Sequence, residues 1–347
     1  MEDGDEEALA LWRRFRDVSI EQIKLTYERL NVRFDVYSGE SQVNDGMRQA
    51  MKLLEEKNLL KDSDGAKIID LEKYKLGVSV VEKRDGTTLY ITRDIGAAIE
   101  RYQKYNFDEM YYIVASQQDL HLKQLFKTLE LLELPWAKNC QHINFGLVKG
   151  MSTRKGTAVF LDNILNDTRD SMHNVMKQNE ERYAKTANPE RVADVIGVSA
   201  VVVQDMAARR IKNYEFNWQR MFSFEGDTGP YLQYAHTRLC SIERNAKVTV
   251  NPNADVTLLT EKAALDLVEQ IARYPDLLLA TRKSMEPCNV VTYALQLSHL
   301  VSSALESLWV VGQEQPVAEA RLLLYWSARQ TLGNALRLIG LTPLEQM

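Results

Sequence analysis

The sequence predicts a chain of two differently built parts, an α/β portion with a parallel sheet followed by an all-α helical bundle. Up to about residue 150, short β-rich runs alternate with helical patterns, which indicates parallel strands joined by helices. Beyond that point, long segments carry apolar residues at helical spacing. A stretch rich in glycine and cations, "KGMSTRKGTAVFLDN" at 149–163, lies between the two parts.

The α/β portion begins with apolar residues at helical spacing, which predict a helix over 7–30. A β-rich run ending in a turn then predicts a strand over 32–39. Two strand–helix units follow, a strand over 86–92 with a helix over 93–105, and a strand over 109–116 with a helix over 117–134. Residues 39–86 are charged and hold only short strand-like pieces, so we interpret them as an insertion at the edge of the sheet.

The second portion is predicted to be a helical bundle, separate from about residue 226 onward. Proline and glycine mark the breaks between its helices. Within the first helix, the run Val201–Val203 also fits a short strand. The predicted helices cover 192–211, 231–246, 261–283, 290–311 and 316–340.

The composition indicates a soluble, intracellular protein. Lys and Arg number 43 against 48 Asp and Glu, a formal net charge of −5, which argues against a nonspecific nucleic-acid coat, and we expect no DNA partner. Cys140, Cys240 and Cys288 lie far apart, so they predict neither a disulfide framework nor a metal site. No apolar stretch approaches the roughly 18 residues of a membrane span, and the acidic start is unlike a signal peptide.

The connecting stretch places Ser152, Thr153, Arg154 and Lys155 together between two apolar runs. A hairpin needs one or two glycines but not this density of donors and cations. A flexible, cationic loop suits an anion that carries spread charge, such as a polyphosphate. The alternative is a solvated hairpin tip.

Three polar residues follow the predicted strands at the edge where ligands bind in open parallel sheets. Tyr90 is placed at the end of one strand, Asp94 at the start of the next helix, and Gln118 just past the next strand. A carboxylate there can take a guanidinium in a forked, charge-assisted bond. The alternative is that Asp94 only caps its helix. His121 fits a surface or core position, because no nucleophile and no metal cluster accompanies it.

The segment "FEGDTGPYLQYAHTRL" at 224–239 places two tyrosines at the start of a helix. Tyr231 and Tyr234 are three positions apart, so they share a helix face and could stack on unpaired bases. His236 and Arg238 lie nearby as phosphate donors. The alternative is that the tyrosines belong to the core.

These stretches, together with "DGTTLYITRDIGAA", "ASQQDLH" and "EGDTGPYLQYAHTR", closely resemble cytosolic arginyl-tRNA synthetases of the fungal type. The resemblance covers essentially the whole chain and implies the second half of a class I Rossmann-type sheet, followed by a helical anticodon-binding domain. The implied domains are a partial catalytic domain over 1–150, with its insertion at 39–86, the signature loop with a connecting helical region over 151–225, and the anticodon-binding domain over 226–347.

The resemblance also implies site residues. Met151, Ser152, Thr153, Arg154 and Lys155 correspond to the signature loop that closes over the phosphates of Mg-bound ATP. Tyr90, Asp94 and Gln118 correspond to residues that hold the substrate arginine. Tyr231, Tyr234 and Met347 correspond to residues that contact the anticodon arm of tRNA-Arg. His236 and Arg238 lie beside them in the sequence. Leu305 stands where the family has a tyrosine next to the anticodon.

One departure bears on activity. The family binds ATP with an earlier His-x-Gly-His element, and none of the five histidines here has that spacing. We therefore expect a cytoplasmic, arginyl-tRNA synthetase-type protein whose chain is inactive alone and does not bind ATP tightly. A half sheet also exposes a strand edge, which a protein partner or second chain could cover. The alternative function is an inactive relative that binds tRNA or a protein.

Overall fold

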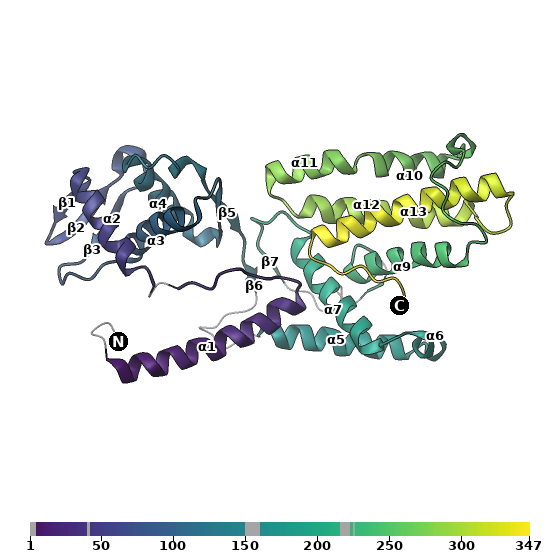
Figure 1. The fold of residues 1–347 in the computed structure, drawn as a ribbon, viewed down its shortest axis with the longest axis horizontal. Helices are drawn as coiled ribbons and strands as arrows, with labels where there is room; N and C mark the ends of the chain where they lie inside the picture. The colour runs from purple at the N-terminus through teal and green to yellow at the C-terminus, as the bar shows by residue number, and fades with distance from the viewer. Residues whose placement is uncertain (1–4, 40–41, 150–159, 216–222, 225) are drawn as a thin grey trace. The chain divides into compact units, whose positions relative to one another are not determined.

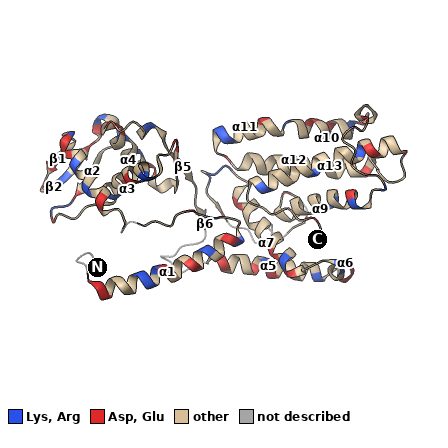
Figure 2. Ribbon diagram, in the orientation of Figure 1, with Lys and Arg blue, Asp and Glu red and all other residues tan. Residues whose placement is uncertain are grey.

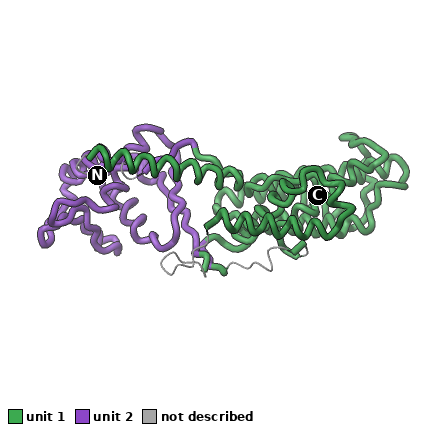
Figure 3. Tube along the Cα trace, turned by 90° about the horizontal axis from the view of Figure 1, so that it is seen from below, with its two compact units in different colours: residues 1–34, 148–210, 214–347 green, residues 35–147, 211–213 purple. Residues whose placement is uncertain are grey.

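The computed structural model describes residues 5–39, 42–149, 160–215, 223–224 and 226–347. The chain falls into two compact units, coloured separately in Figure 3. Unit 1 comprises residues 1–34, 148–210 and 214–347, and unit 2 comprises residues 35–147 and 211–213. The domain boundaries that the sequence predicts near residues 150 and 226 remain predictions. The two units are groups of residues that pack together, and such a grouping does not by itself locate a domain boundary.

Unit 2 contains the parallel pair of strands that the sequence predicts. Strand β4 (Met110–Ala115) pairs in parallel with β5 (Cys140–Phe145), with Met110 opposite Cys140. The crossover between them is the 3-10 turn η3 (Ser116–Gln118), helix α4 (Asp119–Leu131) and the 3-10 turn η4 (Ala137–Asn139). Parallel strands need such a crossover, so the strand–helix pattern predicted this part of the fold correctly.

Two predicted strands are wrong. Over 86–92 only Thr88 forms an isolated bridge, with Glu82, and helix α3 (Tyr90–Tyr105) already begins at Tyr90. The Thr92 hydroxyl donates to the carbonyl of Val81, which fixes this first turn of the helix. Residues 32–39 form no strand, because no described strand pairs with them.

Residues 39–86 contain a sheet of their own rather than an edge of the parallel pair. Strands β1 (Leu60–Ser63), β2 (Ala66–Asp70) and β3 (Val78–Glu82) are antiparallel in that order, with the 3-10 turn η2 (Glu72–Tyr74) before β3. The preceding helix α2 (Asn44–Glu56) crosses α3 where Gly46 meets Gly96. A Cβ on Gly46 would lie 2.6 Å from the carbonyl oxygen of Gly96, so the crossing requires glycine. Side chains from α2, β2, β3, α3 and α4 share one apolar core.

Unit 1 is mainly helical (Figure 1). The short strands β6 (Val148–Lys149) and β7 (Tyr214–Glu215) form a parallel pair. A 3-10 turn, η6, covers Val256–Leu258. The described helices are α1 (Glu6–Arg29), α5 (Leu161–Lys177), α6 (Glu180–Lys185), α7 (Pro189–Met206), α9 (Gly229–Asn245), α10 (Lys262–Ala272), α11 (Tyr274–Ser284), α12 (Cys288–Ser307) and α13 (Gln315–Leu338).

The predicted helical bundle is confirmed. Helices α9, α10, α12 and α13 bury one large apolar core, in which the fully buried Tyr325 donates its hydroxyl to the carbonyl of Leu308. Val201–Val203 is helical, as part of α7. The segment 261–283 forms two helices, because Pro275 can occupy only the first turn of a new helix.

The C-terminal end of α1 is anchored to α5 and α7. The Arg29 guanidinium donates to Asp194 at 2.6 Å and to Asn166 at 2.9 Å, and the Thr26 hydroxyl donates to Asp162 at 2.7 Å. No side chain of α1 is buried, although the helix carries apolar residues. Side-chain polar contacts therefore hold this helix, rather than a buried apolar face.

Candidate functional site

The predicted arginine-binding residues lie in unit 2, around α3 and the start of α4. Tyr90 is the first residue of α3 and is 66% exposed. Gln118 ends the 3-10 turn after β4 and is also exposed. Asp94 sits one turn into α3, with its side chain 41% exposed. Polar groups are thus available at the carboxyl end of β4, where the topology predicts a ligand site.

Asp94 does not cap its helix. The N-cap position is Leu89 and the first turn contains no acid, so the carboxylate makes no bond to the free N–H groups of α3. Its Oδ2 instead lies 2.6 Å from Nε2 of His121 on α4. His121 thereby orients the carboxylate of Asp94. The sequence gives no signal for this pair, because only the packing of α3 on α4 joins the two residues.

A second polar group ties the two parallel strands to α4. The amide of Asn144 donates to Oδ1 of Asp119 at 3.0 Å, and His142 Nδ1 lies 3.6 Å from the same oxygen. Nε2 of His142 donates to the carbonyl of Val114 at 2.8 Å. Among the residues that the structure describes, no group of three His, Cys, Asp or Glu side chains is arranged to hold a metal ion.

The predicted signature-loop residues, Met151, Ser152, Thr153, Arg154 and Lys155, lie outside the described residues. Of the described residues next to them, Lys149 ends β6 and is exposed, and Phe160 precedes α5. The role of this loop at the phosphates of ATP therefore remains a prediction.

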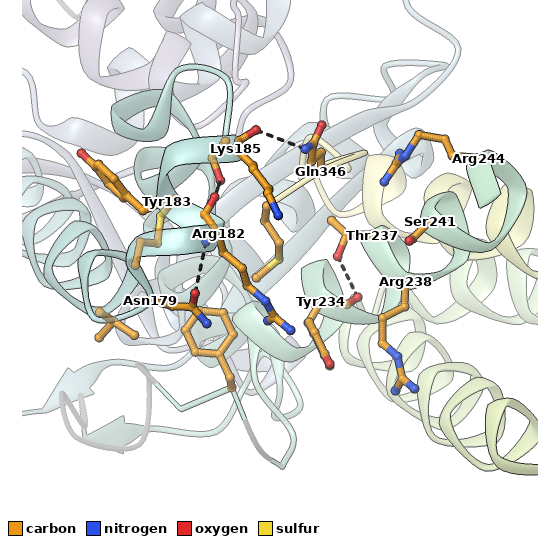
Figure 4. A pocket seen from close by; sticks show the side chains of 15 residues that line it. Asn179, Arg182, Tyr183, Lys185, Tyr234, Thr237, Arg238, Ser241, Arg244 and Gln346 are labelled. Atoms are coloured by element: carbon orange, nitrogen blue, oxygen red, sulfur yellow. Dashed lines mark hydrogen bonds between the residues drawn. The ribbon is translucent and has the colours of Figure 1, made fainter.

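A cavity of unit 1 lies between helices α5 and α6 on one side and α9 with the C-terminal residues on the other (Figure 4). Its volume is about 640 Å³. The lining combines aromatic, cationic and small polar side chains: Val175, Met176, Asn179, Arg182, Tyr183, Lys185, Thr186, Phe224, Tyr234, Thr237, Arg238, Ser241, Arg244, Gln346 and Met347. We call this cavity the α6–α9 pocket.

The α6–α9 pocket is cationic although the whole chain is acidic. Four of the lining residues are Lys or Arg, and none of the described lining residues is acidic. The guanidinium of Arg238 lies over the ring of Tyr234, 5.5 Å from its centroid. Cations around an aromatic ring suit an anionic ligand with a flat, stackable part, which is the chemistry of a nucleotide.

The C-terminal residues are held in place by side chains of α9. Gln233 is fully buried, accepts from the backbone N–H of Leu344 at 2.9 Å and donates to the carbonyl of Thr342 at 3.0 Å. The Arg244 guanidinium donates to the carbonyl of Glu345 at 2.9 Å. These bonds place Met347 in the lining of the α6–α9 pocket.

His236 also helps to hold the C-terminal residues in place and does not line the α6–α9 pocket. The residue is only 4% exposed, and its Nδ1 donates to the carbonyl of Leu344 at 2.7 Å. Burial lowers the pKa of His236 below its usual range, and the nearby Arg329 and Arg337 lower it further. This buried ring is not placed to contact a phosphate, so its geometry favours an indirect role.

Tyr231 also differs from the expected arrangement. Its hydroxyl lies 3.1 Å from Nδ1 of His299 and 3.2 Å from the hydroxyl of Ser302, both on α12. Leu305 packs against the same apolar core as Tyr231. Among the predicted RNA-binding residues, Tyr234, Arg238 and Met347 line the α6–α9 pocket, whereas Tyr231 and His236 do not.

Comparison with known families matches nearly the whole chain. Residues 1–218 match the family model described as "tRNA synthetases class I (R), catalytic domain", and residues 232–347 match the "DALR anticodon binding domain". The α6–α9 pocket is lined by residues of both matched regions.

None of the described helices has the length and apolar character needed to cross a membrane.

Relatives agree with the family match. The chain is 57% identical to the cytoplasmic arginine–tRNA ligase of Saccharomyces cerevisiae and 56% identical to a probable cytoplasmic arginine–tRNA ligase of Dictyostelium discoideum. All of this chain is covered in both alignments, but the chain spans only 58% and 59% of the length of these relatives.

Solved structures show the same fold. The arginyl-tRNA synthetase of Plasmodium falciparum superposes with a TM-score of 0.88 at 23% identity, covering 100% of this chain and 60% of the other. That of Thermus thermophilus gives 0.80 at 21% identity, covering 93% of this chain and 62% of the other. The chain therefore belongs to the class I arginyl-tRNA synthetase family, with a catalytic-type region followed by a DALR anticodon-binding domain.

Proposed function

We propose that this chain serves the cytoplasmic attachment of arginine to tRNA-Arg, and that its own contribution is to bind the tRNA and to recognise the arginine side chain. The observation that supports this most is the α6–α9 pocket, which joins four cations and the ring of Tyr234 without an acidic residue among the described lining. The match of residues 232–347 to an anticodon-binding domain supports the anticodon arm as the part of the tRNA bound there.

The chemistry of the pocket fits one unpaired base with its flanking phosphates. An exposed base can stack on Tyr234, and such stacking is worth about 1–3 kcal/mol per base. Arg238 already lies beside that ring and can pair with a phosphate without reorganisation. Ser241 supplies a hydroxyl group from the same helix for a base edge.

Arginine recognition rests on Asp94. His121 holds one carboxylate oxygen at 2.6 Å, so the other oxygen is presented in a fixed direction to a guanidinium. Tyr90 and Gln118 are exposed beside it and can add a hydroxyl and an amide. A lysine ammonium cannot reproduce the forked geometry of a guanidinium, which would favour arginine.

ATP, with Mg²⁺ on its phosphates, is a substrate of the intact family, and we propose Met151 to Lys155 as the segment that contacts it. The 347 residues contain no His-x-Gly-His element, the element with which the family binds ATP. We therefore propose that these 347 residues alone neither bind ATP tightly nor charge tRNA. Loss of one preorganised donor costs roughly 10²–10³ in rate, and here several would be missing.

A second candidate function is that of an inactive relative that also binds a protein. Its supporting observation is the parallel pair β4–β5, in which Ile113 is 71% exposed and Phe145 is 41% exposed. Parallel sheets are normally covered on both faces, so these side chains form a surface that a partner chain could bury.

Equilibrium binding of a tRNA-Arg transcript tests the proposed function. We expect the chain to bind at low salt and Tyr234→Ala to weaken binding by about tenfold, as the loss of one stacked base predicts. Tyr105→Ala is the matched control, because Tyr105 is an exposed tyrosine beside a cation, Lys104, in unit 2. Equal affinities for both variants and the parent would exclude the α6–α9 pocket as the RNA site. Arginylation and ATP–pyrophosphate exchange in the same preparation separate a ligase from a binding module.

Calorimetry with free arginine tests the other part of the proposal, that the chain recognises the arginine side chain. We expect an affinity in the millimolar range or weaker, near −4 kcal/mol, because only the side chain is recognised. Asp94→Asn should abolish that binding, while Asp119→Asn, which removes a neighbouring carboxylate held by Asn144, should leave it unchanged. Micromolar affinity that survives Asp94→Asn would show that another site binds arginine.

A further inference from the structure

The short helix α6 contributes a cation to the α6–α9 pocket that none of the predicted site residues includes. We infer that Arg182 of α6 binds an RNA phosphate across the pocket from Arg238, so that two separate elements hold the RNA backbone on either side of the base at Tyr234. The inference rests on the proposed RNA-binding function and adds a contact from the region that matches the catalytic domain.

Helix α6 is held firmly enough to present a side chain in a fixed place. The hydroxyl of Tyr183 lies 2.8 Å from Nε2 of His173 on α5, and the two rings are 5.6 Å apart. Asn179 caps the helix by accepting from the backbone N–H of Arg182 at 3.1 Å. At the other end, the amide of Gln346 donates to the carbonyl of Lys185 at 3.3 Å, which joins α6 to the C-terminal residues.

The charge of Arg182 is available, whereas other cations of the pocket are engaged. Lys185 pairs with Glu181 at 2.6 Å, and Arg244 donates to the carbonyl of Glu345. No described acidic residue pairs with Arg182, and the residue is exposed. An unpaired guanidinium in a cavity lined by other cations raises the local positive potential, which a phosphate lowers.

Arg182 and Arg238 both lie near the ring of Tyr234. In Figure 4 the side chain of Arg182 points from α6 in the direction of Tyr234, and that of Arg238 extends from α9 beside the same ring. A nucleotide whose base stacks on Tyr234 carries one phosphate on its 5′ side and another on its 3′ side. Cations on two elements can therefore each take one phosphate, which holds the backbone on both sides of the base.

The test is a binding titration of the full chain with a tRNA-Arg transcript over a series of salt concentrations. We expect Arg182→Ala to weaken binding by about fivefold at low salt and to lower the slope of log K against log salt by about 0.7, the value for one phosphate contact on a single strand. Arg182→Lys should restore most of the slope, because it restores the charge. Arg191→Ala on α7 is the matched control, since Arg191 is an exposed arginine outside the pocket lining.

The outcomes separate this inference from the proposed function. One outcome is that only Tyr234→Ala weakens RNA binding, with Arg182→Ala showing the same affinity and salt slope as Arg191→Ala. In that case Arg182 does not contact the RNA, but the pocket still binds it. If the parent chain binds no RNA at low salt, both fail. Urea unfolding of each variant shows whether the overall fold is retained, and Arg182→Gln provides a second variant that keeps part of the hydrocarbon stem while removing the charge.

Discussion

At the scale of single residues, two tyrosines on one helix have different partners. Tyr231 and Tyr234 are three positions apart on α9, and the sequence predicted a shared role from that spacing. Helix α12 covers Tyr231 and bonds its hydroxyl through His299 and Ser302, whereas Tyr234 faces the α6–α9 pocket. Spacing along a helix identifies neighbours on its surface but not the element that packs against each of them.

This difference predicts separable effects of two conservative changes. Tyr231→Phe removes the hydroxyl bonded to α12, so we expect a loss of about 0.5–1.5 kcal/mol in the free energy of unfolding and less than a twofold change in RNA affinity. Urea denaturation and RNA titration of the same preparation measure the two quantities. A Tyr231→Phe variant with unchanged stability and tenfold weaker RNA binding would place its hydroxyl at the RNA instead.

The buried ring of His236 makes the stability of the chain depend on pH. Because burial lowers the pKa of His236 in the folded state, the unfolded chain binds more protons below about pH 6.5, the ordinary value. Folded-state stability is therefore fully present above that pH and is lost as the pH falls. His236→Gln can still donate to the carbonyl of Leu344 but does not titrate.

We expect the difference in unfolding free energy between the parent and His236→Gln to be constant above pH 7. Below about pH 6.5 the parent should lose stability relative to His236→Gln as the pH falls. Denaturant unfolding from pH 5 to 8 gives this difference directly. His299→Gln serves as a control, because the side chain of His299 is 53% exposed. Parallel pH profiles for parent and His236→Gln would show that His236 protonates equally in the folded and unfolded states.

At the scale of elements, helices were predicted well and strands poorly. The spacing of apolar residues defines a helix from the chain alone, and α1, α3, α4, α7, α9, α12 and α13 overlap their predicted segments, whereas no separate segment was predicted for α2, α5 or α6. A strand also needs a partner at a distant position, which periodicity does not supply. Strand β4 has β5, but residues 32–39 have no pairing strand among the described residues. The short strand-like pieces expected in 39–86 are strands β1–β3, but their pairing into a separate antiparallel sheet was not predicted, because periodicity does not show which strands pair.

The crossing of α7 and α9 depends on a single glycine. A Cβ on Gly229 would lie 2.1 Å from the carbonyl oxygen of Ser199, so Gly229→Ala must push the two helices apart. We expect a loss of about 1–3 kcal/mol in the free energy of unfolding, the usual cost of an overpacked contact. Gly39→Ala, where no atom lies within 4 Å of the added methyl group, should be nearly neutral. Equal thermal midpoints for the two variants would show that α9 can shift without cost.

At the scale of the whole molecule, the sequence predicted the family and the order of the two parts, but not the pocket. Basic and acidic residues are mixed along the ribbons of both units, so the charge pattern of the sequence does not reveal where cations gather (Figure 2). Arg182 and Arg238 lie far apart in the chain and line one cavity only because α5, α7 and α9 pack together. The same packing lines one pocket with residues of both matched family regions.

Ultraviolet crosslinking of the chain to a tRNA-Arg transcript, followed by peptide mass spectrometry, tests most directly whether the α6–α9 pocket is the RNA site. Aromatic and sulfur-containing side chains against a base crosslink readily, so we expect crosslinked peptides that contain Tyr234, Phe224 and Met347, with their yield reduced in Tyr234→Ala. Peptides of unit 2 around Tyr105 should remain unmodified and serve as the internal control. Crosslinks that map to unit 2 or to α10–α11, with none at the pocket, would contradict the proposed RNA site.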